Sequence, residues 1–246
     1  MRGIYRNWIL VLAAGAVAAG CSDELSGPSS PTTVAAFKKA ASEIPAFPGV
    51  DAFVDGIDNP YLAYEPGRVF HYEGETDEGI ETIVVEVTNQ KKTVMGVDVT
   101  VVRDRVYLDG ELIEDTDDWF AQDEDGNVWY FGEDSKEIED GEVVSTEGSW
   151  EAGINGNPGI IMLAAPYRGA QYAQEEAPGI AEDMARVKSL DASVEVEYGT
   201  FDGCLQITEW TPLEPGPRED KFYKAGLGLV LERGRGGERV ELVEIE

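Results

Sequence analysis

The chain has very few of the residues on which common catalytic and metal centres depend. It contains one histidine, His71, and two cysteines, Cys21 and Cys204, among 246 residues. A zinc site built from several histidines is therefore impossible. A Ser-His-Asp triad would have to use His71, and the Gly-x-Ser-x-Gly turn that often carries the serine is missing. We therefore expect no metal, no cofactor and no triad hydrolase.

Positive charge is also scarce. Lysine and arginine number 19 against 49 aspartates and glutamates, for a formal net charge of −30. A field of this sign repels the phosphates of nucleic acids and attracts cations or basic partners, so we expect no nucleic-acid partner. Because close pairs of acids arise by chance in such a chain, a carboxylate pair is a weak sign of a glycosidase.

The N-terminus has the pattern of a signal peptide. Arg2 and Arg6 make it positive, no acid precedes Asp23, and residues 8–20 are apolar or small. This run is too short, and too rich in alanine and glycine, to make a convincing span of a hydrocarbon core of about 30 Å. We expect residues 1–20 to be cleaved.

Residues 18–21, Ala-Ala-Gly-Cys, resemble the lipobox of bacterial lipoproteins, with Ala18 where that family usually has leucine. The resemblance implies a diacylglycerol on the Cys21 sulfur and an acylated new N-terminus, with fatty acids such as palmitate. An ordinary cleaved signal with an incidental cysteine is the alternative. Residues 21–33 are polar and contain proline, which is typical of a flexible tether.

The lipobox resemblance implies a location as well. The membrane would be a partner through the lipid, and the folded part would lie on the extracytoplasmic side of the cell envelope. In a Gram-negative cell, Ser22 after the cysteine resembles the signal for sorting to the outer membrane. If Cys21 is acylated, Cys204 has no partner for an internal disulfide, and its apolar surroundings favour a buried side chain.

The remaining chain is predicted to be all-β after one short helix. Apolar residues at helical spacing over 34–44, followed by Pro45 and Pro48, predict a helix and a linker within 34–50. From residue 51 the period becomes two, with strands expected over 82–88, 97–108, 194–198 and 205–210. Asp-Gly pairs at 109–110, 125–126 and 140–141 predict hairpin turns.

These patterns predict one antiparallel domain over residues 51–246. We expect a meander of about ten to twelve strands, curved into an open half-barrel or sandwich. Residues 181–190 fit either a helix or an edge strand. Residues 152–169 are rich in glycine and are expected to form a surface loop with one short strand over 160–163.

One hairpin has aromatic residues on both faces. Neighbouring residues of a strand point to opposite faces, so Trp119 and Phe120 diverge, as do Trp129 and Tyr130. Either the second face is covered by the N-terminal helix or a loop, or one face lines a cavity that receives a ligand. These four residues are the candidate ligand-binding site.

The acids beside this hairpin have simpler interpretations. Residues 123–127 fail as an EF-hand, because Gly126 in the sixth position would place Ala121 and Gly132 at ligand positions. A hairpin turn explains them. The acidic run 114–118 is interpreted as a solvated strand edge.

A second resemblance covers most of residues 57–231. The segments 57–61, 194–201 and 222–230 are similar to recurring segments of a family of secreted bacterial proteins, with glycines at corners and rings in the core. It implies an open, curved antiparallel sheet and no particular activity. The functional hypothesis is a binding or carrier module for an apolar ligand or a protein partner. A carboxylate-dependent envelope glycan hydrolase and a purely structural envelope protein are the alternatives.

Overall fold

Most of the described chain is β-strand. The computed structural model describes residues 44–246 apart from 63, 77, 215, 217 and 235. Within this part the only helical element is the single 3-10 turn η1 (Val50–Ala52), and it has no helix long and apolar enough to cross a membrane. The signal peptide, Cys21 and the tether lie outside the described residues, as does nearly all of the helix expected over 34–44.

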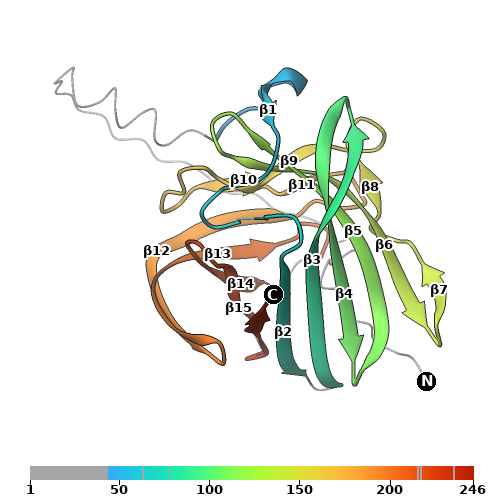
Figure 1. Cartoon of the computed structure of the whole chain (residues 1–246), viewed down its shortest axis with the longest axis vertical. Coiled ribbons are helices and arrows are strands. Elements are labelled where there is room, and N and C mark those ends of the chain that lie inside the picture. Colours follow the sequence, from blue (N-terminus) through green and yellow to red (C-terminus); the bar gives the residue numbers. More distant parts are fainter. Residues whose placement is uncertain (1–43, 63, 77, 215, 217, 235) are drawn as a thin grey trace, which may run out of the picture.

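Two antiparallel meanders form one curved wall (Figure 1). The pairing of β16 with β2 joins the second meander to the first, so that the last strand lies beside the first strand of the first meander. The first meander contains β2 (Val69–Thr76), β3 (Gly79–Val94), β4 (Val97–Leu108), β5 (Glu111–Asp123) and β6 (Val128–Glu139). The second contains β12 (Met184–Val196), β13 (Gly199–Trp210), β14 (Glu219–Lys224), β15 (Gly228–Gly234) and β16 (Arg239–Ile245).

The expected antiparallel fold and its turns are confirmed. Each of the three Asp-Gly pairs connects two consecutive paired strands. At Asp109-Gly110 the φ angles are 48° and 86°, and Asp140-Gly141 has a similar backbone. Two successive positive φ values match the right-handed twist of the strands, which is why such turns favour tight hairpins.

Short strands complete the sheet and raise the described total to sixteen. Twelve of them have four or more residues, and the other four have two or three. Residues 184–190 are strand, which settles the ambiguous region in favour of β12. The strands outside the two meanders are β1 (Phe53–Val54), β7 (Glu142–Ser145), β8 (Trp150–Glu151), β9 (Asn157–Met162), β10 (Gln171–Ala173) and β11 (Glu175–Glu176).

The expected surface loop over 152–169 is wrong in one respect. Its strand is present as β9, but this strand pairs with β6 and contributes to the core, with Ile160, Met162 and Leu163 at most 3% exposed. Gly153 and Gly169 are exposed as expected, but Gly159 is buried. At Gly159 a side chain would lie 2.1 Å from the Gln174 carbonyl oxygen, so glycine permits a close approach of two backbones.

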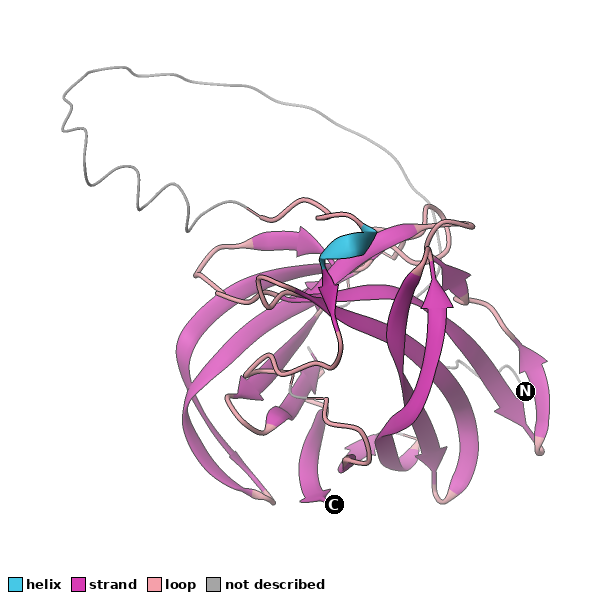
Figure 2. Ribbon diagram, turned by 45° about the horizontal axis from the view of Figure 1, so that its top comes forward, coloured by secondary structure: helices cyan, strands magenta, loops and turns pink. Residues whose placement is uncertain are grey.

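A six-residue segment brings the two ends of the sheet together. Strand β10 pairs with β12 at one end of the strand order, and β11 pairs with β9 at the other. Only Gln174 separates β10 from β11. The backbone N–H groups of Gln174 and Glu175 both donate to the Asp183 carbonyl, at 2.7 and 3.2 Å. The sheet therefore closes almost completely into a barrel (Figure 2).

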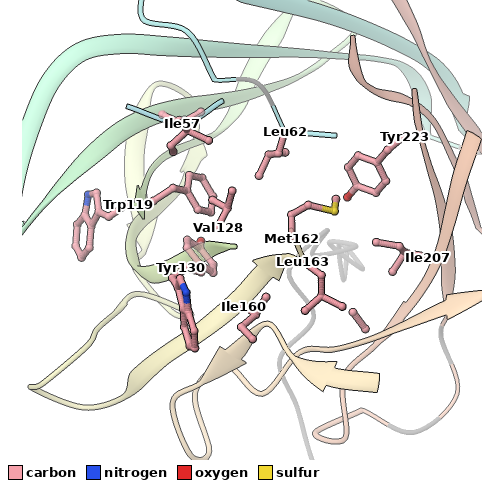
Figure 3. Close-up of a cluster of buried hydrophobic side chains, with 14 of the residues drawn as sticks. Ile57, Leu62, Trp119, Val128, Tyr130, Ile160, Met162, Leu163, Ile207 and Tyr223 are labelled. Carbon is pink, nitrogen blue, oxygen red and sulfur yellow. The ribbon is translucent and has the colours of Figure 1, made fainter. Parts of the chain in front are cut away.

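One end of the barrel is filled by apolar side chains. Strands β1, β9, β10 and β11 lie across this end of the long strands in Figure 1. Figure 3 shows Met162 of β9 and the following Leu163 between the wall of β5 and β6 and the wall of β13 and β14, with Leu62 beside them. All three are buried. This plug leaves the rest of the interior to a different set of residues.

Candidate ligand-binding site

Beside the plug, the two meanders surround a cavity of about 220 Å³. Its walls alternate in and out with the period of a strand, so that Val102, Asp104 and Val106 of β4 all line it. Its aromatic lining consists of Tyr64, Phe70, Tyr72, Phe120, Tyr130, Trp210 and Tyr223. Its acidic lining consists of Asp104, Glu114, Asp118, Glu175, Asp183, Glu209, Glu219 and Glu232, and its two cations are Lys221 and Arg218.

The acidic run 114–118 is not a solvated edge, so that expectation is wrong. It lies in β5, which pairs with β4 on one side and β6 on the other. Alternate residues of the run, Glu114, Thr116 and Asp118, line the cavity. Asp117 points outward, where the Arg103 guanidinium donates to it at 2.9 Å. The closed sheet thus divides one acidic run between two environments.

A tyrosine hydroxyl joins two carboxyls in the wall. The Tyr130 hydroxyl lies 2.5 Å from Asp118 Oδ1 and 2.9 Å from Glu133 Oε2. A phenol has one proton to donate, so both contacts can be hydrogen bonds only if one carboxyl is protonated. Glu133 is 1% exposed. Its burial, together with the charges of Glu175 and Asp118, raises its pKa well above the usual range. We therefore assign the proton to Glu133, leaving Asp118 to accept from Tyr130.

Burial dominates the titration of the other cavity acids. It raises the pKa of Asp118 to about 7, against the opposing hydrogen bond from Tyr130. It also raises the pKa of Asp104 well above the usual range, and nearby carboxylates, Asp118 first among them, add to the effect. A buried carboxylate loses its hydration without gaining an equivalent partner, so its charged form becomes costly.

On the opposite wall a lysine is already paired. Lys221 of β14 lies 2.9 Å from a Glu209 oxygen on β13 and 3.3 Å from a Glu232 oxygen on β15. Burial by itself would lower the pKa of this lysine, but the two carboxylates more than offset that effect and the pKa is raised. Gln174 donates a further hydrogen bond to Glu209 at 2.9 Å. The charge of Lys221 is therefore already balanced by Glu209 and Glu232.

Three carboxyls facing the cavity, those of Glu175, Asp104 and Asp183, have an oxygen with no hydrogen-bond partner in the described structure. Glu175 is 4% exposed, and the Trp150 indole donates to its Oε1 at 3.3 Å, while Oε2 accepts nothing. Asp104 Oδ1 is also buried without a partner. Because buried polar atoms are nearly always satisfied, such atoms at a cavity wall indicate a place for a donor.

The four aromatic residues predicted as a site divide between the two faces of the sheet. Phe120 and Tyr130 line the cavity, and their rings stack with centroids 4.7 Å apart. Trp119 and Trp129 do not line it, although both are at most 6% exposed. One face of this hairpin therefore lines a cavity, and the other face is covered.

The outer face of the hairpin is covered by the N-terminal segment and by a lysine. Phe47 packs edge-on against Trp129, with ring centroids 5.5 Å apart. Lys92 Nζ lies 3.0 Å from the centre of the Trp119 ring. The Trp129 indole donates to Asp123 Oδ2 at 2.8 Å, and Asn127 N donates to Asp123 Oδ1 at 2.8 Å. Asp123 thus stabilises the turn, as the hairpin interpretation of residues 123–127 expects.

The residues with familiar chemistry lie away from the cavity. The His71 ring lies 3.2 Å from a Glu246 oxygen and is not part of the lining. Cys204 is buried, and burial raises the pKa of its thiol. Among residues 44–246 as described, no three His, Cys, Asp or Glu side chains are grouped closely enough to hold a metal ion.

Sequence reasoning missed most of the cavity. The sequence does not distinguish Asp104, Lys221 and Glu232 from the many other charged residues of the chain. One signal was present: Thr116 and Asp118 lie in phase with Phe120, so a face carrying a large ring also carries polar groups. A mixture of aromatic and polar side chains on one face is typical of a ligand cavity, whereas a hydrophobic core has apolar side chains alone.

No protein-family model matches the chain, and no curated protein matches it. Similar solved structures include a protein from Bacteroides fragilis NCTC 9343, described as exported and as having a YmcC-like fold. It shares 14% identity with a TM-score of 0.44 over 79% of this chain and 99% of that one. Another, described as a lipoprotein from Parabacteroides distasonis ATCC 8503, shares 10% identity with a TM-score of 0.41 over 76% and 99%. Likeness at this level does not extend to function.

Proposed function

We propose that the protein is a non-catalytic binding module of the cell envelope, tethered to a membrane through an acylated Cys21, that holds a small molecule inside its barrel. The observation that carries the proposal is the cavity of about 220 Å³ between the two meanders, with its aromatic and carboxyl lining. A concave site with rings and a few convergent polar groups is the usual form of a small-molecule site. The signal-peptide pattern and the lipobox resemblance support the location.

The size of the cavity limits the ligand. A cavity of roughly 150 Å³ in an apolar protein core holds benzene, so about 220 Å³ suits a molecule of about nine non-hydrogen atoms. A membrane lipid with two long acyl chains is much too large to be enclosed. The ligand is therefore a metabolite-sized molecule, and the apolar carrier hypothesis narrows to a small compound.

The hydrolase alternative finds one feature in its favour and one against. Asp118 and Glu133 are brought together on one tyrosine hydroxyl, and paired carboxyls are what a glycosidase needs. Glu133, however, does not line the cavity, so only one of the two reaches a bound molecule. Asp118 and Glu133 therefore do not form a catalytic pair.

Native mass spectrometry of the full chain, purified without denaturant, tests binding in the barrel. We expect a mass excess of one small molecule that is lost on unfolding. Val85→Phe places a ring in the cavity and should abolish the excess, whereas Val84→Phe, on the opposite face of the same strand, should retain it. An unliganded chain that also binds none of a panel of small molecules would leave the structural envelope role instead.

Fatty-acid labelling tests the anchor. We expect a clickable palmitate analogue to label the wild-type chain and not Cys21→Ser, and the variant to leave the membrane fraction. Two or more acyl chains hold a protein stably at a bilayer, while the polar tether does not bind the membrane by itself. An unlabelled wild-type chain, or a variant that stays equally membrane-bound, contradicts the anchor without touching the cavity.

A further inference from the structure

The cavity has a strong excess of negative groups over positive ones. Eight carboxyl side chains line it, against Lys221 and Arg218. Lys221 is held between two of these carboxyls. The Arg218 guanidinium lies 5.0 Å from the centre of the Trp210 ring, on an exposed residue that brings one end of the cavity to the surface. Lys221 lowers the pKa of Asp104 and Asp118 through its charge, but neither cation forms an ion pair with Asp104, Asp118 or Glu175 in the described structure.

Resting on the proposed function, we infer that the ligand is a small organic cation, an amine with an attached apolar or aromatic part. Its ammonium group lies against Asp104 and Asp118 on β4 and β5. The oxygen without a partner on Asp104 is an acceptor that this ammonium completes, and the one on the deeply buried Glu175 shows the same shortage of donors at the cavity wall. Three N–H groups of a primary ammonium can satisfy several acceptors at once.

Aromatic rings supply the second half of the recognition. Tyr64 lies 5.7 Å from Phe120 and 6.3 Å from Phe70, measured between ring centres, and Phe120 stacks on Tyr130. All four rings line the same cavity as the carboxyls. The face of an aromatic ring attracts an ammonium group and also covers apolar carbon. Rings beside carboxylates are therefore suited to an amine that has an apolar part.

Other ligand classes fit less well. An anion would meet the eight carboxyls and would have to displace Glu209 or Glu232 to reach Lys221. A metal ion needs closely grouped ligands, and the described acids are spread too widely over the walls to form such a group. Acids spread over the walls are better suited to an organic cation than to a single metal ion.

Charge on the protein links binding to pH. Burial raises the pKa of Asp118, so a bound cation must displace a proton at low pH, and affinity should fall between pH 8 and pH 5. The titratable groups around Asp118 either change its pKa through their charge or have their own pKa changed by it. They are Asp104 on β4, Glu114 and Asp117 on β5, Tyr130 and Glu133 on β6, Glu175 on β11 and Lys221 on β14.

Three probes that share one ring test the inference by isothermal titration against the full chain. Phenethylamine, 2-phenylethanol and phenylacetate have about nine non-hydrogen atoms each, which the cavity can hold. We expect the amine to bind at one site, the alcohol to bind at least about tenfold more weakly, and the acid not to bind. The affinity for the amine should fall at least about tenfold from pH 8 to pH 5.

Substitutions inside and outside the cavity test where phenethylamine binds. Asp118→Asn should weaken phenethylamine at pH 8 by at least about tenfold, and Asp104→Asn tests the same carboxylate pair should the first variant not fold. Asp117→Asn, the adjacent residue on the outer face, should bind as the wild type does. Val85→Phe should abolish binding of every probe. Equal affinity for the amine in the Asp117 and Asp118 variants overturns the inference.

The remaining outcomes separate this inference from the proposed function. If the three probes bind equally and Val85→Phe blocks them all, the cavity binds ligands but charge selects none, and the cation inference falls alone. A neutral or anionic molecule found by native mass spectrometry has the same meaning. If no probe binds and no molecule co-purifies, both fall together.

Discussion

Replacing Asp118 with asparagine should make the protein less sensitive to rising pH. In the folded chain the Asp118 carboxyl has a pKa of about 7, against 3.8 in the unfolded chain. The folded state therefore holds this proton more tightly. Its contribution to the free energy of unfolding is undiminished below pH 3.8, decreases as pH rises between the two values, and is constant above about pH 7.

The size of the effect follows from the shift. Each pH unit inside this window costs about 1.4 kcal/mol, so Asp118 should remove about 2–3 kcal/mol between pH 5 and pH 8. Asparagine keeps the hydrogen bond with Tyr130 and does not titrate. The charge of Asp118 also raises the pKa of Asp104 and of Glu133, so its removal reduces their contributions as well.

Urea unfolding followed by tryptophan fluorescence measures this difference. Between pH 5 and pH 8 the midpoint of the wild type should fall by about 1 M urea more than that of Asp118→Asn. Asp117→Asn, which changes the outer face beside Arg103, should follow the wild type. If Asp118→Asn and the wild type lose equal stability over this range, Asp118 is charged already at pH 5 and the interior is more hydrated than its burial implies.

Three further substitutions test how the walls are held. Lys221→Met leaves two buried carboxylates without their cation and should cost about 3–5 kcal/mol at pH 8 and less at pH 5, measured by urea unfolding. Gly159→Ala pushes a methyl group against the Gln174 carbonyl and should lower the melting temperature by more than Gly141→Ala, an exposed turn position where the cost is about 1–2 kcal/mol; equal losses would mean that the backbones separate freely. Asp123→Ala removes the acceptor of three buried donors, the Asn127 backbone N–H, the Asn127 side-chain amide and the Trp129 indole, and should cost about 2–4 kcal/mol. Near-ultraviolet dichroism should change because the indole loses its partner, and an unchanged spectrum would contradict the assigned bond.

Much of the fold was readable because its signals are local. A period of two and an Asp-Gly pair involve residues a few positions apart, so the strands at 82–88 and 97–108 and the turn at 109–110 were predicted correctly. The pairing of β16 with β2 could not be read in this way, because it joins residues more than 150 positions apart, such as Leu242 and Tyr72. No local pattern specifies which distant edges meet.

The candidate site shows the same division. The doubled aromatic hairpin signalled from the sequence that both of its faces are occupied, since Phe120 and Trp119 must diverge whatever the register. Whether the face of Phe120 or that of Trp119 looks inward depends on the direction in which the sheet curves. Closure of the barrel turned Asp118 toward the cavity and Asp117 toward Arg103.

The sequence by itself determined several of the long strands, the tight turns and the acidic charge, because each is encoded in neighbouring residues or in composition, and it predicts the lipid anchor. Only the tertiary structure decided which acids are buried. Lys221 meets Glu209 and Glu232 because three strands pair in one register, and Asp104 lost its water because β4 became part of a closed wall. Burial and distance set the energy of a charge, and both arise only once the ends of the sheet have come together.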